Sequence, residues 1–223
     1  MLTKTANMKK VLVFSLLLGF SIVSFAQNLK LGVCLNPHFD WFNENSSLMK
    51  SDGSKTGIMG GLVVENYFSK NYAFATGIML GSYGGRLVYN DSVTIRTDEN
   101  NTKVPPNLLV KYKLQYITVP IGLKLKTNQF GYFSYYASLG FAPQINIRAK
   151  AEAGSILDNA DIGKEVGLFN ISYYFGAGLE YGIGGSTAIV VGVTYNNGFM
   201  DILTKQDSKV ILNYLTVNVG VMF

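Results

Sequence analysis

Apolar and polar residues alternate along most of the chain after residue 27, and this two-residue period is typical of half-buried β-strands. In the first stretch, Leu31 and Val33 lie on one face, while Gly32 and Cys34 lie on the other. No window after residue 27 shows a sustained helical period. Eight alternating runs cover residues 29–42, 56–69, 72–89, 108–126, 131–149, 166–183, 187–200 and 210–223.

The connections between these runs alternate in length. Tight turns are expected at 69–71, 127–129 and 184–186, and longer loops at 43–55, 90–107, 150–165 and 201–209. Short turns on one side and long loops on the other are the arrangement of outer-membrane barrels, in which the short turns are periplasmic. The sequence therefore predicts an all-β protein, an eight-stranded antiparallel up-and-down transmembrane β-barrel.

The composition of the polar faces supports this interpretation. Charged residues make up 15% of the chain, against about 25% in soluble domains, and the polar faces carry mainly Gly, Ser, Asn and Tyr. Small polar side chains suit a narrow lumen, with the apolar faces turned to lipid. A secreted lipocalin-like carrier is the alternative, and it requires Gly140, Asn146, Asn170 and Ser172 to point to water.

The first 26 residues read as a signal peptide. Lys9 and Lys10 precede an apolar run at 11–23, and a small-x-small cleavage site ends at Ala26. The run of about 13 residues is short for a spanning helix, which needs about 20. We expect cleavage after Ala26 and a barrel domain over 27–223, and Met8 is an alternative start to Met1.

The charge of the mature chain is small. Loss of Lys4, Lys9 and Lys10 leaves 16 basic residues (19 minus 3) against 14 acidic ones, so the formal charge falls from +5 to +2. A mature protein with this balance has no basic patch that would indicate nucleic-acid binding.

Two features of the strands call for a local irregularity. Pro37, Pro120 and Pro143 fall inside expected strands, so each should lie at a bulge or near a strand end. In the run 108–126, the apolar residues change from even to odd positions near Tyr116. This change indicates either one inserted residue or a strand that extends beyond the membrane, where facing matters less.

Three segments resemble a known family. Tyr116–Lys124 is similar to the Y-x-x-x-P-x-x-x-K strand of the small outer-membrane barrels grouped with PorT. Residues 195–202 resemble their penultimate strand, and the terminal 219–223 resembles their last strand, which ends in Phe. The resemblance implies an eight-stranded barrel in the outer membrane and brings no catalytic residues. The secretion role of PorT itself is not carried over.

Charged residues expected to face the lumen gather near the tight turns. By alternation these are Lys30, Glu65, Lys124, Lys126 and Glu180. Since Lys facing lipid would cost about 2–4 kcal/mol, an inward network is the cheaper arrangement. A salt-bridged plug is favoured over a proton or ion relay, because so narrow a lumen is filled with side chains.

His38 is the chain's single His, and Asp40 lies on the same strand face. The pair could serve as base and orienting group of a surface hydrolase acting on lipid or peptide, but no nucleophile stands out. A polar pair at the rim of the lumen is the favoured interpretation. One Cys and one His also make a cysteine-based zinc site or a two-imidazole metal site impossible, and we expect no metal and no cofactor.

These observations predict a non-enzymatic, monomeric outer-membrane protein that anchors, binds or assembles through its outer loops. Its expected partners are the outer-membrane lipid bilayer, the insertion machinery, and an unidentified protein or surface ligand at loops 43–55, 90–107 and 150–165. A channel is disfavoured, since eight strands leave no continuous water path. Phe223 is expected to act as the assembly signal on the last strand.

Overall fold

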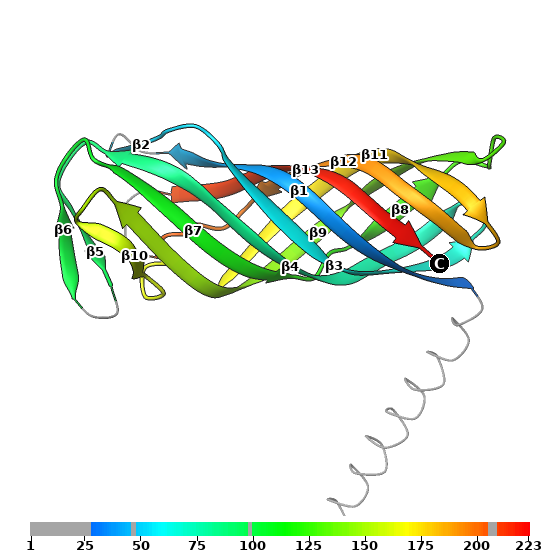
Figure 1. Cartoon of the computed structure of the whole chain (residues 1–223), viewed down its shortest axis with the longest axis horizontal. Helices are drawn as coiled ribbons and strands as arrows, with labels where there is room; N and C mark the ends of the chain where they lie inside the picture. The colour runs from blue at the N-terminus through cyan, green and yellow to red at the C-terminus, as the bar shows by residue number, and fades with distance from the viewer. Residues whose placement is uncertain (1–27, 46–47, 98–99, 205–208) are drawn as a thin grey trace, which may run out of the picture.

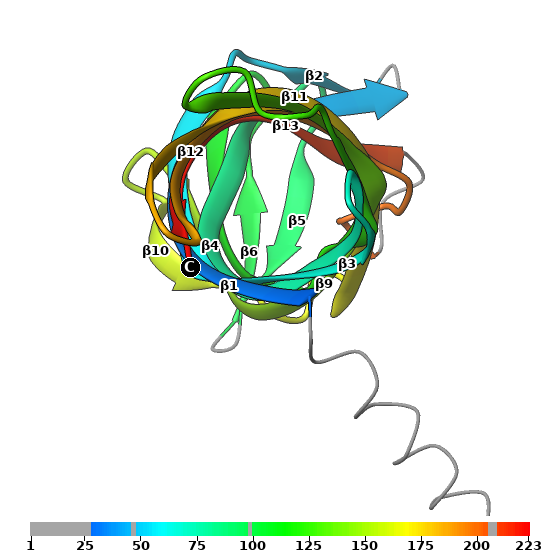
Figure 2. The ribbon, with the colours of Figure 1, turned by 90° about the vertical axis from the view of Figure 1, so that its right-hand side faces the viewer.

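The computed structural model describes residues 28–45, 48–97, 100–204 and 209–223, and these form a closed antiparallel barrel (Figures 1 and 2). Around the ring lie β1 (Leu29–Asn45), β3 (Lys55–Ser69), β4 (Tyr72–Tyr89), β7 (Leu109–Thr118) with β8 (Ile121–Lys126), β9 (Phe133–Ala153), β11 (Phe169–Gly184), β12 (Thr187–Gly198) and β13 (Lys209–Met222). β7 and β8 continue one another, and β1 pairs with β13 to close the ring. The predicted eight-stranded up-and-down barrel is confirmed. Among the described residues, no helix is long and apolar enough to cross a membrane.

The two ends of the barrel differ. At the turn end lie both termini of the barrel and the short connections, and at the loop end lie the long ones (Figure 1). Part of each of three long loops is itself strand. β2 (Met49–Ser51) pairs with β4, β10 (Leu157–Asp161) pairs with β9, and β5 (Val93–Arg96) forms a hairpin with β6 (Asn101–Val104). The sequence pattern did not predict these four short strands.

Over the turn end and the middle of the barrel, apolar side chains point outward. Leu62 and Ile78 are 61% and 63% exposed, whereas Asn170 and Ser172 are buried inside. The secreted carrier is therefore wrong, because its polar face would meet water. The outward side chains, called the apolar belt below, include Leu31, Leu35, Ile58, Leu62, Phe74, Ile78, Leu80, Ile121, Leu139, Phe141, Ile145, Val191 and Val219.

At the loop end the pattern is reversed, because apolar side chains fill the interior. The strands supply Phe42, Leu87, Val110, Tyr112, Leu114 and Leu212, and the loops and short strands supply Ile95, Val104, Leu157, Ile162, Ile202 and Leu203. All are 3% exposed or less. This set, called the loop-end core below, closes the barrel interior under the long loops.

In the fourth strand of the ring, formed by β7 and β8, the change of apolar positions near Tyr116 is not caused by an inserted residue. Even-numbered side chains face inward from Val110 through Thr118 to Lys124, and only their polarity changes. The register shift lies on the partner strand, where Tyr116 pairs with Asn146 and Gln115 with Arg148, which leaves Ile147 as the extra residue of a bulge in β9. The alternative of a strand that continues past the membrane is the one the structure favours.

The three prolines occupy gaps in the hydrogen-bonded ladders. Pro120 lies between β7 and β8, near a strand end as expected. The expectation is wrong for Pro143 and Pro37, which lie inside strands without a bulge. Pro143 faces the β7–β8 break and accepts the Val119 N–H, and beside Pro37 the Asn36 side chain accepts the Val219 N–H. Both strands thus keep their register across the missing backbone bonds.

Candidate functional site

Four of the expected lumen charges form an ion cluster near the turn end. Lys124 Nζ lies 2.5 Å from Glu65 Oε1 and 2.5 Å from Glu180 Oε1, and Lys126 pairs with the other oxygen of Glu180. Glu65, Lys124 and Glu180 are each less than 5% exposed. They come from β3, β8 and β11, so the contacts join strands that are not neighbours in the ring. Two positive and two negative groups give the cluster no net charge.

Lys30 is attached to this cluster indirectly. It lies directly opposite Glu65 in the β1–β3 ladder, but it forms no ion pair with any described residue. Its Nζ lies 5.5 Å from the centre of the Tyr67 ring, and the Tyr67 hydroxyl donates to Glu65 Oε2 at 2.8 Å. Tyr67 is the member of this group that sequence reasoning missed, although its place two residues after Glu65 on the same face was a usable signal.

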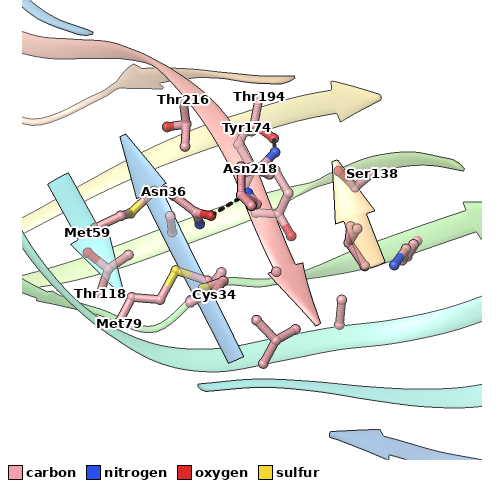
Figure 3. Close-up of a pocket in the computed structure, with 18 of the residues that line it drawn as sticks. Cys34, Asn36, Met59, Met79, Thr118, Ser138, Tyr174, Thr194, Thr216 and Asn218 are labelled. Atoms are coloured by element: carbon pink, nitrogen blue, oxygen red, sulfur yellow. Dashed lines mark hydrogen bonds between the residues drawn. The ribbon is translucent and has the colours of Figure 1, made fainter. Parts of the chain in front are cut away.

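A cavity of about 160 Å³ lies in the lumen between the ion cluster and the loop-end core. Figure 3 shows Cys34, Asn36, Thr216 and Asn218 around it, from β1 and β13. Asn218 Nδ2 donates to Thr194 Oγ1 at 2.6 Å, so part of the polar lining is already paired within the wall. Glycines keep the lumen open to large rings: a side chain at Gly178 or Gly192 would overlap the Tyr136 hydroxyl, which lies across both.

His38 and Asp40 are held together under the loop end. His38 Nδ1 lies 2.5 Å from Asp40 Oδ1, and Asp40 Oδ2 accepts the Gly84 N–H at 3.0 Å. The His38 ring stacks on Tyr83, with 4.6 Å between centroids. Both His38 and Asp40 are fully buried, so their expected place at the rim is wrong: the loop-end core continues above them. The Gly84 N–H is available to Asp40 because the β3–β4 ladder ends at Ile58 and Ser82, so Gly84 pairs with β7 on one side and has no partner from β3 on the other.

The pair lacks the geometry of a hydrolase. Thr216 lies opposite His38 in the β1–β13 ladder, and the buried atoms His38 Nε2, Thr216 Oγ1 and Ser172 Oγ form no hydrogen bond in the described part of the chain. A nucleophile would need to donate to His38 Nε2 and meet a substrate, and full burial prevents the second. Within the described ranges, no group of three or more His, Cys, Asp or Glu side chains could hold a metal ion.

The long loops are tied to one another over the loop-end core. Glu165 accepts the Arg96 N–H with its side chain and the Thr204 N–H with its carbonyl. The Gly167 N–H donates to Ile202 O, and the Tyr89 and Tyr112 hydroxyls lie 2.6 Å apart beneath. The three loops that contain β5–β6, β10 and residues 199–204 therefore form one folded layer, called the cap below.

Phe223 ends the chain at the turn end. Its N–H donates to Leu31 O at 2.7 Å, and its side chain is 53% exposed. The ring lies at the edge of the apolar belt, beside the first strand.

A closed ring of eight strands, apolar outside and polar inside, defines an integral membrane β-barrel of the outer-membrane type. The family model described as "Outer membrane protein beta-barrel domain" matches residues 12–204. The chain belongs to this family, and it is an outer-membrane protein.

Solved barrels resemble this chain weakly in sequence. Neisserial surface protein A is 16% identical with a TM-score of 0.48, covering 88% of this chain and 96% of its own. Ail of Yersinia pestis is 17% identical with a TM-score of 0.38, covering 87% and 98%. OprG of Pseudomonas aeruginosa is 13% identical with a TM-score of 0.42, covering 87% and 95%. No curated protein matches the chain.

Proposed function

We propose that this protein is a non-enzymatic surface component that is anchored in the outer membrane by its apolar belt and binds a partner with its cap. The observation that carries this proposal is the folded cap, in which Glu165 joins the β5–β6 hairpin to the segment before β13. A preorganised surface loses less conformational entropy on binding than free loops do. Transport through the barrel is disfavoured, because side chains occupy the lumen at two heights: the loop-end core at one end and the neutral ion cluster near the other.

Site-specific photocrosslinking in intact cells tests the cap as the contact surface. The crosslinker is placed at exposed cap positions, Thr94 and Asp158, and at the exposed turn-end position Lys70 as control. The proposal expects the same partner at both cap positions and no such adduct at Lys70. It also expects loss of the adduct in Lys103→Glu, which reverses the charge of an exposed side chain on β6 of the cap. Adducts of equal yield at Lys70, or none at either cap position, contradict it.

The absence of catalysis has its own test. His38→Ala should still give a folded, heat-modifiable barrel, with the partner crosslinks unchanged, because His38 is buried beneath the cap. A hydrolytic activity of the wild type on lipid or peptide that disappears completely in this variant would overturn the non-enzyme proposal.

We also propose that the chain belongs among the small barrels grouped with PorT. Supporting this, two residues of the shared segment have structural roles here: Pro120 lies at the β7–β8 break and Lys124 at the centre of the ion cluster. Exchange of residues 116–124 for the same segment of such a barrel should preserve the yield of folded protein. Loss of the folded barrel contradicts the grouping.

A further inference from the structure

Five cationic side chains gather on the outer wall of the barrel at the loop end. They are Arg86 on β4, Lys111 and Lys113 on β7, and Arg148 and Lys150 on β9. In the ladders, Arg86 lies opposite Lys111 and Lys113 opposite Lys150. Since side chains opposite one another are about 5 Å apart, the five form one continuous surface, called the basic face below.

The basic face points away from the barrel and is poorly neutralised. Its chain neighbours Leu87, Tyr112 and Ala149 are buried in the loop-end core, so alternation turns the cations outward. Lys113 pairs with Glu152. Lys111, Arg148 and Lys150 form no ion pair with any residue of the described ranges. Two carboxylates lie beside the five cations: Glu152, which is paired with Lys113, and Asp161, which lies opposite Lys150 in the β9–β10 ladder. The face therefore keeps an excess of positive charge.

The lower part of this face lies near the height of the lipid headgroups. Ile117 is the last apolar outward residue of β7, and the next outward positions are Gln115, Lys113 and Lys111. Each step of two residues advances about 6.6 Å along the strand, or about 5 Å along the membrane normal at a tilt near 40°. Lys113 thus stands about 10 Å above the edge of the hydrocarbon. The headgroup layer is about 5–8 Å thick. A flexible Lys side chain that starts just above this layer can reach down into it.

The opposite wall lacks this charge. At the loop end of β11 and β12, the outward positions are Tyr173, Tyr195 and, just beyond β12, Phe199, which contact one another or Phe175. Uncharged aromatic rings are usual at a membrane interface. The cluster of five cations on β4, β7 and β9 is therefore a local feature and not a general property of the rim.

We propose that the basic face binds the phosphate groups of anionic lipid headgroups in the outer leaflet. The face is continuous with the apolar belt, so a lipid whose chains lie on Ile117 and Ile147 brings its headgroup to Arg148 and Lys150. An Arg guanidinium holds phosphate through two parallel hydrogen bonds, and Lys adds a point charge. This site is separate from the cap and does not depend on the partner proposed there.

Native mass spectrometry of the barrel folded in non-ionic detergent tests the proposal. Dioleoyl phosphatidic acid and dioleoyl phosphatidylcholine are the probes, and Arg148→Gln/Lys150→Gln is compared with the matched double variant Lys103→Gln/Lys209→Gln, whose residues are exposed at the loop end. Each cation near an anionic surface contributes about fivefold in affinity, so the first variant should bind phosphatidic acid about 25-fold more weakly. The control should stay within about twofold of the wild type.

Three results would overturn the proposal. The wild type could bind both lipids equally, which decides the matter even if a variant fails to fold. The control variant could lose as much affinity as Arg148→Gln/Lys150→Gln, which would make the effect one of net charge. Inorganic phosphate at micromolar concentration could bind the lipid-free barrel and be lost in the same variant, which would place the ligand in solution.

Discussion

The two halves of this barrel are built from the same strands with opposite polarity. Along β7 and β8 the inward side chains keep one phase, yet they are apolar at Val110 and Tyr112 and polar at Thr118 and Lys124. Outside, the exposed residue is apolar at Ile121, in the apolar belt, and charged at Lys111, at the loop end. The loop end thus resembles a soluble β-domain continuous with a membrane protein. Strand geometry fixes which residues share a face, and the surrounding solvent decides which face is apolar.

The halves are also held together differently. The loop end is held by apolar burial, in which side chains such as Leu87 lose contact with water at about 25 cal/mol per Å². In the membrane half, apolar side chains can face lipid, so burying them in the lumen gains little free energy. Paired charges and hydrogen bonds hold the lumen together there instead. A buried pair is costly to break on one side, because a lone charge is left out of water.

The largest effect is expected at the ion cluster. Lys124→Met leaves Glu65 buried with only the Tyr67 hydroxyl as a hydrogen-bond partner, and breaking a buried pair this way costs about 3–5 kcal/mol. Urea unfolding of the barrel in lipid vesicles, followed by Trp41 fluorescence, should show this loss of unfolding free energy.

Glu65→Gln/Lys124→Met is the matched control for that prediction. It removes both charges, and Glu180 keeps its pairing with Lys126, so most of the lost stability should return. A single Lys124→Met variant as stable as the wild type would mean that the cluster contributes nothing to the fold.

A second prediction compares two leucines of β4. Leu87 is fully buried in the loop-end core, and Leu80 is 57% exposed in the apolar belt. Leu87→Ala should cost about 3–4 kcal/mol, as transfer and cavity terms add, whereas Leu80→Ala should cost about 1–2 kcal/mol, since lipid fills the space. The difference in urea midpoint between the two variants measures this. Equal losses would contradict a difference between the halves.

The membrane half could be predicted from the sequence, because the outward face of each strand must be apolar where it contacts lipid. The alternation at 29–42 and the polar lumen residues Glu65 and Glu180 followed from that constraint alone. The ion pairs of Lys124 with both carboxylates join three separate strands, and no sequence distance reports such a contact.

The loop end was harder to predict. Ile95, Leu157 and Ile202 belong to short segments without a period, so nothing in the sequence marks them as core. The bulge in β9 did leave a signal. After Ile147, small apolar residues take the odd positions and charged ones the even positions, from Arg148 to Ala153. The change of polarity near Tyr116 was more conspicuous, and it drew the predicted irregularity to the wrong strand.

Phe223→Ala should separate assembly from stability. The ring is half exposed, and the substitution keeps the bond from the residue 223 N–H to Leu31 O, so the unfolding free energy should change by about 1 kcal/mol or less. If the ring is the assembly signal, the yield of heat-modifiable protein in the outer membrane should fall while refolding into detergent does not. Parallel loss of both yields would make Phe223 a structural anchor, and no loss of either would contradict the signal.

The smallest effect is expected at Lys113 and Glu152, an ion pair of the same chemistry as Lys124 and Glu65 but placed on the water-facing wall. The hydrogen bond from Lys113 holds the pKa of Glu152 below its usual value. A lowered folded-state pKa contributes stability above the unfolded-state pKa, and this contribution is lost as pH falls through the folded-state value. Glu152→Gln should therefore unfold at a slightly lower urea concentration than the wild type at pH 7. The two midpoints should converge as pH falls through the folded-state pKa of Glu152, and 0.5 M salt at pH 7 should bring them together as well, since exposed charges are screened. Because both proteins share the buried carboxylates, their difference isolates this pair. A gap that stays constant as pH falls, and that salt does not reduce, would mean that Glu152 acts through packing and not through its charge.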